Sequence, residues 1–226
     1  MKITAANLIR WAGLSAMVAG LFYVIEGLFH PPNVLASVTT TRWAIVHVLE
    51  GAMTFFGLIG ITGLYARQAE KSGWLGLVGY ILFSLWLVFV TGFLFFEAFI
   101  LPQLATEAPA FAEGFLGMFT GSASEVDLGV LPVLWMLTAP LYIFGGLLFG
   151  LATFRASILP RWAGALLAIG VVIAPVAVLF PPEHALKIAV LVGLALMWLG
   201  YATWAERRER ASEAVLGRDE LSIVTT

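Results

Sequence analysis

The residues best suited to chemistry in this chain are three histidines and three glutamates near one end of long apolar segments. They are His30, His47 and His184, with Glu26, Glu50 and Glu97. An ionisable group inside hydrocarbon costs roughly several kcal/mol, so such groups rarely gather there without a function. Their common depth therefore predicts a functional site within a membrane.

Helical periodicity places these groups on shared faces. At about 100° per residue, the step from Glu26 to His30 and the step from His47 to Glu50 each keep both residues on one face. The glutamates lie about 5–12 Å below the outer interface, counting about 1.5 Å per residue from the segment ends. His184 begins the last segment at a similar depth. We expect one pocket to collect all of them.

The residue types leave three kinds of chemistry open. The three histidines, with carboxylates beside them, suit a transition metal ion such as zinc, copper or iron. Alternatively, the three glutamates serve as catalytic acids or bases that move protons on an apolar small molecule. The same groups also suit the proton path of a transporter. The chain has no cysteine, which excludes thiolate ligands and disulfides.

The composition is that of an integral membrane protein. Of the 226 residues, 61% are hydrophobic and 12% are charged, and the mean hydropathy is +0.96. Soluble domains are about 45–50% apolar and about 25% charged. The sequence lacks the alternating ten-residue pattern of a transmembrane barrel, so we expect an all-α helix bundle.

Six apolar segments are long enough to cross a bilayer as helices, at about 20 residues each. They cover residues 8–29, 43–66, 74–100, 129–154, 162–180 and 185–204. We therefore predict one domain of six transmembrane helices over residues 1–205, followed by a charged tail over residues 206–226. The connection at 101–128 lacks Lys and Arg and carries phenylalanines at helical spacing. There we expect an amphipathic helix on the outer face, either a lid over the polar groups or a surface helix without function.

The cations indicate the orientation. Ten of the 12 Lys and Arg residues fall at the amino terminus, in the second and fourth connections and in the tail. By the positive-inside rule both termini are cytoplasmic, and the polar groups lie toward the outer side of a bacterial inner membrane.

An internal repeat is also predicted. The sequence Arg-Trp-Ala-Gly begins at residue 10 and again at residue 161, and each copy is followed by a Pro-Pro pair, at 31–32 and 181–182, with a histidine nearby. This pattern favours three helical hairpins of the same orientation. The alternative is that Trp and Arg anchor helix ends at the interface and Gly allows close packing, as in many membrane proteins.

The layout resembles that of small, uncharacterised six-helix proteins of bacterial inner membranes. The segments His-Val-Leu-Glu-Gly at 47–51 and Val-Ile-Glu-Gly at 24–27 are similar to the His and Glu-Gly segment of emopamil-binding sterol isomerases. That resemblance implies that a His and two Glu shift a double bond, although the spacing here is one residue shorter and those enzymes have fewer helices. Glu26, His30 and His47 also resemble the membrane copper site of methane and ammonia monooxygenases, which implies copper ligation.

Several functions have no support in the sequence. It has no Gly-x-Ser-x-Gly, phosphate-loop or His-Glu-x-x-His motif, and the arginines at 207–210 alternate with glutamates, so we expect no nucleic-acid partner. The expected partners are the lipid bilayer, an apolar small molecule, and other membrane proteins or a second copy of the chain. A non-catalytic accessory subunit is a further alternative, and it predicts His and Glu residues too far apart to share a ligand. Whether the protein is an enzyme stays open.

Overall fold

The structure, a computed structural model, describes residues 3–176 and 190–205, and the regular structure of these residues is entirely helical. The all-α prediction is thereby confirmed for this part of the chain. The helices are α1 (Ala5–Phe29), α2 (Leu35–Val38), α3 (Thr41–Phe99), α4 (Leu101–Glu107), α5 (Pro109–Thr120), α6 (Leu131–Ala156) and α7 (Arg161–Val176), followed by an apolar helix at Val190–Ala205. The predicted metal ligand His184, the second Pro-Pro pair and the charged tail lie outside the described residues.

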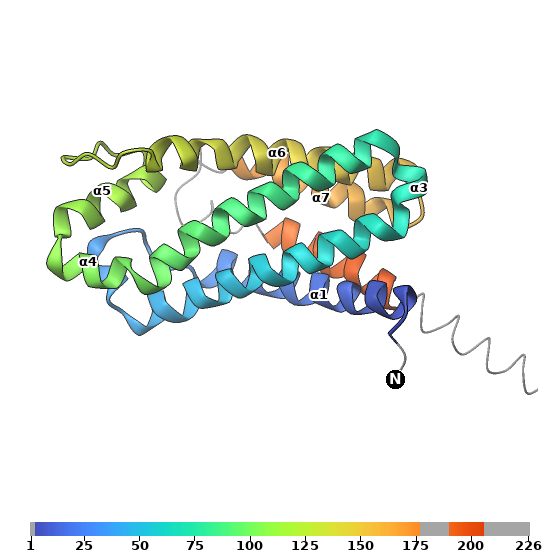
Figure 1. Cartoon of the computed structure of the whole chain (residues 1–226), viewed down its shortest axis with the longest axis horizontal. Helices are drawn as coiled ribbons and strands as arrows, with labels where there is room; N and C mark the ends of the chain where they lie inside the picture. Colours follow the sequence, from blue (N-terminus) through green and yellow to red (C-terminus); the bar gives the residue numbers. More distant parts are fainter. Residues whose placement is uncertain (1–2, 177–189, 206–226) are drawn as a thin grey trace, which may run out of the picture.

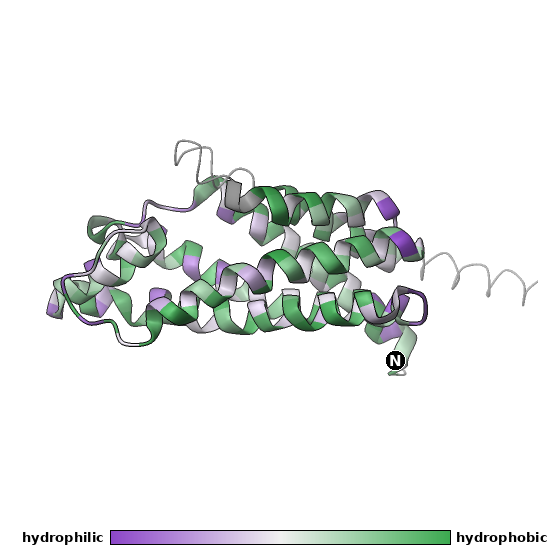
Figure 2. Cartoon of the chain, turned by 90° about the horizontal axis from the view of Figure 1, so that it is seen from above, coloured by the Kyte–Doolittle hydropathy of each residue, from purple (hydrophilic) through white to green (hydrophobic). Residues whose placement is uncertain are grey.

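Three of these helices are long and apolar enough to cross a membrane. They are α1 with 25 residues, α3 with 59 and α6 with 26. Hydrophobic residues run along their length, and hydrophilic residues gather toward the two ends of the bundle (Figure 2). These helices fit the membrane protein that the composition predicts.

Helix α3 is folded back on itself at Gly73. This residue has φ 58° and ψ −157°, a backbone conformation outside the helical region that is essentially restricted to glycine. Beyond it the two halves of α3 run side by side in opposite directions (Figure 1). The hydroxyls of Thr62 and Tyr80 lie 3.1 Å apart across the halves, and Thr91 donates to Thr54 at 2.8 Å.

The second connection differs from the prediction. The predicted segments at 43–66 and 74–100 leave a connection between them, but residues 68–72 continue the first half of α3, and the chain reverses at Gly73. Gln68 explains why the segment stays helical and packed. Its side-chain amide is buried and donates to the hydroxyl of Thr153 on α6 at 2.8 Å, a contact that an exposed loop would not make.

Small residues let the helix backbones approach closely. A Cβ at Gly79 on α3 would meet the backbone of Phe149 on α6, and a Cβ at Gly145 would meet the backbone of Phe83. Gly20 on α1 is similarly pressed against Gly193 in the helix Val190–Ala205. Such contacts are typical of helix association in membranes, where van der Waals packing replaces the hydrophobic effect.

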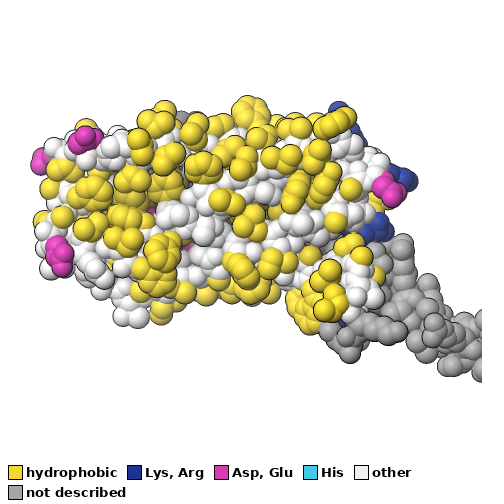
Figure 3. Space-filling view, viewed as in Figure 1, with side chains coloured by type: hydrophobic (Ala, Val, Ile, Leu, Met, Phe, Trp, Pro, Cys, Tyr) yellow, Lys and Arg dark blue, Asp and Glu magenta, His cyan; other side chains and the backbone are white. Residues whose placement is uncertain are grey.

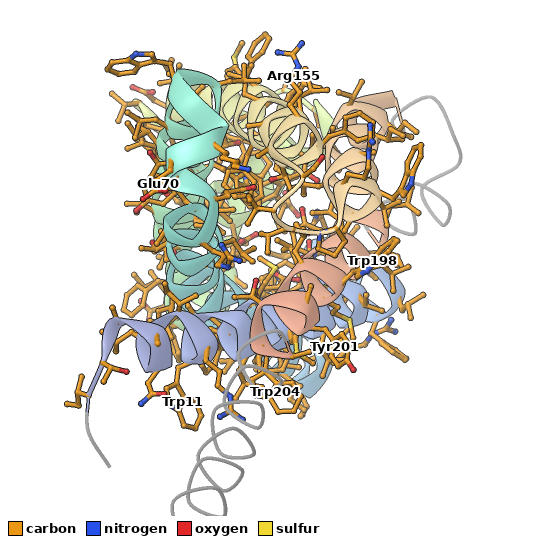
Figure 4. All side chains as sticks on the ribbon, turned by 90° about the vertical axis from the view of Figure 1, so that its right-hand side faces the viewer. Trp11, Glu70, Arg155, Trp198, Tyr201 and Trp204 are labelled. Carbon is orange, nitrogen blue, oxygen red and sulfur yellow. The ribbon has the colours of Figure 1, made fainter. Side chains whose placement is uncertain are left out.

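Charge divides the molecule by its ends. In Figure 3 the Lys and Arg side chains gather at the end that also carries the amino terminus, most of the visible acidic side chains lie at the opposite end, and hydrophobic side chains cover the surface between them. At the cationic end, Trp11 and Trp204 point outward from the bundle (Figure 4). The Arg10 guanidinium lies 5.4 Å from the centre of the Trp204 ring. This end therefore has the Trp and Arg anchors of a membrane interface.

The opposite end is closed by α4 and α5 (Figure 1). Phe115 of α5 is fully buried, and its ring centre lies 6.3 Å from that of Phe93 and 4.7 Å from that of Phe96, both on the second half of α3. The connection at 101–128 thus packs a small aromatic core of its own onto the end of α3 and the start of α6.

Candidate functional site

Three helix segments meet where the predicted site residues lie. The end of α1 carries Glu26, the start of α3 carries His47 and Glu50, and the end of α3 carries Glu97. Since the two halves of α3 are antiparallel, its beginning and end are neighbours at the end of the bundle that α4 and α5 cover (Figure 1). His30 follows α1 directly as its C-cap residue.

Four of the predicted residues line one cavity of about 290 Å³. They are Glu26, His30, Glu50 and Glu97. The rest of the wall is largely apolar and aromatic, with Trp86, Phe93, Phe119 and Trp135 among its members. Carboxyl and imidazole groups therefore line the same cavity as several aromatic rings.

His47 lies beside this cavity and is held in one tautomer. Its Nδ1 lies 2.8 Å from the carbonyl oxygen of Trp43. A carbonyl oxygen only accepts hydrogen bonds, so Nδ1 carries the proton and the Nε2 of the neutral ring keeps its lone pair. This Nε2 is buried, lies 3.8 Å from Oε1 of Glu97, and has no hydrogen-bond partner within the described part of the chain.

Trp43 fixes the position of the His47 ring. The two rings are stacked with their centres 3.9 Å apart. The indole Nε1 of Trp43 donates to the backbone carbonyl of Glu97 at 2.9 Å. One tryptophan therefore orients the imidazole and ties the start of α3 to its end, next to the third carboxyl group.

His30 completes the imidazole pair. Its Nε2 lies 3.7 Å from Oε1 of Glu50, and its ring centre is 5.3 Å from that of His47. Burial lowers the pKa of His30, the backbone hydrogen bond to Pro31 opposes this shift, and the positive charge of Arg42 lowers the pKa further. The neutral imidazole, which is the form that ligates metals, is therefore favoured at neutral pH.

His30, His47 and Glu50 can hold a metal ion. Each offers one ligand atom, and these atoms all lie within 4.8 Å of one another. Zinc bonds of about 2.0–2.2 Å to nitrogen and oxygen put two ligands at most about 4.4 Å apart. Modest side-chain rotations would therefore close the set around one ion, and Glu97 is near enough to His47 to join it.

Unpaired polar atoms gather around the cavity. Within the described residues, Oε2 of Glu26, Oδ1 of Asn33, Nε2 of His47 and Oε1 of Glu50 are buried without a hydrogen-bond partner. Each such atom costs roughly 1–3 kcal/mol unless it is satisfied. A proton, a cation or a polar ligand at this place would offset that cost.

The structure adds residues that sequence reasoning missed. Asn33, one residue beyond the Pro-Pro pair, lines the cavity, and Trp43 carries the contacts described above. Tyr23, which also lines the cavity, donates to Tyr142 of α6 at 3.1 Å. The position of Trp43, one helical turn before His47, was the available signal for its role. Asn33 carried no such signal, because its contacts depend on how the helices pack, whereas helical periodicity places Tyr23 on the face of Glu26 and His30.

Comparison with protein-family models, with curated proteins and with solved structures finds no match. The function proposed below is therefore inferred from the geometry of the site.

Proposed function

We propose that this protein is an integral membrane protein that binds a divalent transition-metal ion through His30, His47 and Glu50. The observation that carries this proposal is the bare Nε2 of His47, a buried lone pair with no hydrogen-bond partner among the described residues. It lies within reach of a second imidazole and a carboxyl group.

The surroundings of His47 favour a metal. Metal-binding histidines almost always donate their other ring N–H to a carbonyl or carboxylate, which fixes the tautomer and orients the ring. The hydrogen bond from His47 to the Trp43 carbonyl has this form. Two imidazoles and a carboxylate suit zinc, iron or copper. A divalent cation would also offset the cost of placing three carboxyl groups around one largely apolar cavity.

The proposed topology has six spans with both termini in the cytoplasm. The spans are α1, the two halves of α3, α6, α7 and the helix Val190–Ala205. Support comes from the Lys and Arg side chains at one end of the bundle (Figure 3) and the positive-inside rule. The metal site then faces the outer side of a bacterial inner membrane. We retain the three-hairpin repeat as part of this proposal.

The test is the metal content of protein purified in mild detergent. We expect wild-type protein to retain zinc, iron or copper in proportion to the chain, and His47→Ala and Glu50→Gln to lose most of it. Glu70→Gln is the matched control, because Glu70 is exposed on α3 toward the opposite end of the bundle, and it should keep wild-type metal. Equal metal content in all four proteins would refute the site.

Proton transfer on an apolar molecule is the second candidate. It is favoured by the Oε2 atom of Glu26, which is buried without a hydrogen-bond partner among the described residues, and by the aromatic rings that line the same cavity as the carboxyl groups. In this case the wild type binds no metal, and Glu50→Gln impairs function more than any single histidine change. The transporter alternative uses the same groups. The accessory-subunit alternative expects these residues to be far apart, and the distances above weigh against it.

A further inference from the structure

An apolar groove lies beside the polar cavity on the side of the bundle. Its volume is about 400 Å³, and its walls come from the second half of α3, from α5 and from the start of α6. Gly92, Phe93, Phe115 and Leu134 are among the lining residues, and all of the others are apolar too. We call this hollow the lateral groove.

The lateral groove faces the region that hydrocarbon would occupy. Val88 lines it and is 55% exposed, and Phe95 on the same helix is 58% exposed. A Cβ added at Gly92 would meet nothing within 4 Å, so the groove is open at this point. In a spanning helix, such a hollow is filled by lipid chains, because an unfilled gap forfeits van der Waals contacts on both sides.

A single aromatic layer separates the lateral groove from the polar cavity. Phe93 lines both hollows. On α6, Leu134 lines the groove and the next residue, Trp135, lines the cavity. The ring centres of Phe93 and Trp135 are 5.4 Å apart in an edge-to-face arrangement. Phe93 is therefore the side chain that the two hollows share.

We propose that the hydrocarbon chain of a bilayer lipid enters the cavity from the membrane, through the lateral groove and past Phe93. This inference rests on the proposed membrane-spanning fold and names the substrate class of the same site, an amphiphile already dissolved in the bilayer. The aromatic rings that line the cavity contact the chain, and the carboxyl and imidazole groups of the same lining lie within the same space. The lateral groove and the cavity each have about the size of small-molecule sites, roughly 300–1,000 Å³.

A second groove supplies the control. It lies between α6 and α7, has a volume of about 490 Å³, and is lined by apolar residues that include Ala165 and Trp162. None of its lining residues also lines the polar cavity.

The experiment uses the full chain in vesicles of phosphatidylethanolamine and phosphatidylglycerol with a trace of phospholipid carrying a diazirine in the middle of one acyl chain. On illumination, part of the diazirine forms a diazo compound. A carboxyl group protonates it, nitrogen leaves, and the carboxylate bonds to the chain carbon as an ester. Peptide mass spectrometry then locates the labelled glutamates. We expect label on the cavity-lining residues Glu26, Glu50 or Glu97.

Two variants should change the amount of label in the cavity in opposite directions. Gly92→Phe fills the lateral groove where space is open, and it should lower the cavity label about fivefold or more. Phe93→Ala removes the dividing ring and should raise the label. The control Ala165→Phe, in the second groove, should leave the label unchanged. Thermal unfolding and metal content of Gly92→Phe should match the wild type.

Two results would overturn the inference. One is label confined to the exposed acids of the outer connection, such as Glu107 and Glu113. The other is cavity label that Gly92→Phe leaves intact. The labelling is repeated after chelation, so a protein that never binds metal still gives a clear answer. Cavity labelling in a wild-type protein that binds no metal refutes the metal site alone, and bound metal without cavity labelling refutes lateral entry alone.

Discussion

At the scale of single residues, the site depends on the protonation of two imidazoles. His47 is committed to one tautomer by the Trp43 carbonyl, and His30 is kept neutral by burial. Both ligand nitrogens must be unprotonated to bind a metal, so protons compete with the ion. The pKa values of the two imidazoles therefore determine the pH range in which protons displace the metal.

We therefore predict that metal is lost as the pH falls. The pKa of a free histidine side chain is about 6.5. Because burial lowers the pKa of His30, its neutral form persists to more acidic pH, and the midpoint of metal loss should lie below that value. Metal content after equilibration across a pH series measures this midpoint. Metal that is lost only as the pH rises would contradict the assignment of imidazole ligands.

The residues that gather at the cavity were partly predictable. The helical period predicted that Glu26 and His30 share one face and that His47 and Glu50 share another. Their common depth from the segment ends predicted that the two faces meet in one pocket. Glu97 was selected by depth alone, and the structure places it 6% exposed on the same cavity. Trp135 was not foreseen, because its position depends on how α6 packs across α3.

At the scale of elements, the hairpin within α3 adds the third carboxyl group to the cavity, because it brings Glu97 to within 3.8 Å of His47. The sequence indicated two apolar helices here, at 43–66 and 74–100, and a connection between them. Polar residues between two apolar segments look the same in a sequence whether they form a loop or continue a helix. Only the buried contact of Gln68 with Thr153 and the conformation of Gly73 distinguish the two.

We predict that Gly73→Ala destabilises the protein by about 1–3 kcal/mol, the cost of forcing a side chain into this backbone region. Nothing lies within 4 Å of a Cβ at Gly73, so the cost is backbone strain and not a clash. Gly92→Ala is the control, since Gly92 is helical with open space around it and alanine favours helix. In detergent, the free energy of unfolding of Gly73→Ala should be lower than that of the wild type, and that of Gly92→Ala should be equal or higher. The reverse order would argue against a fixed turn at Gly73.

At the scale of the whole molecule, composition alone predicted an integral membrane protein. The described residues contain three helices that are long enough to span a bilayer, and the described cations lie mostly at one end (Figure 3). The number of spans and their orientation stay predictions. The closing of the far end by α4 and α5 was not foreseeable in detail, because the sequence indicated one amphipathic helix after Pro109 and gave no signal for the break between Leu101–Glu107 and Pro109–Thr120.

The absence of cysteine from the sequence makes the orientation easy to test. Single substitutions Lys71→Cys and Glu113→Cys place a thiol at opposite ends of the molecule, on exposed positions. In spheroplasts, a membrane-impermeant maleimide should label the Glu113 variant, and it should label the Lys71 variant only after lysis. Labelling of the Lys71 variant in intact spheroplasts would contradict this orientation and place the site on the cytoplasmic side.

The most direct test of the central claim is X-ray absorption at the metal edge of the protein as purified, or after loading of the apo-protein with zinc. The account predicts a first shell of nitrogen and oxygen at about 2.0–2.2 Å, with the outer-shell scattering of two imidazole rings. In His47→Ala that signal should fall to one ring or disappear with the metal. A shell of oxygen alone, without imidazole scattering, or no zinc uptake at neutral pH, would contradict a metal site built on His30, His47 and Glu50.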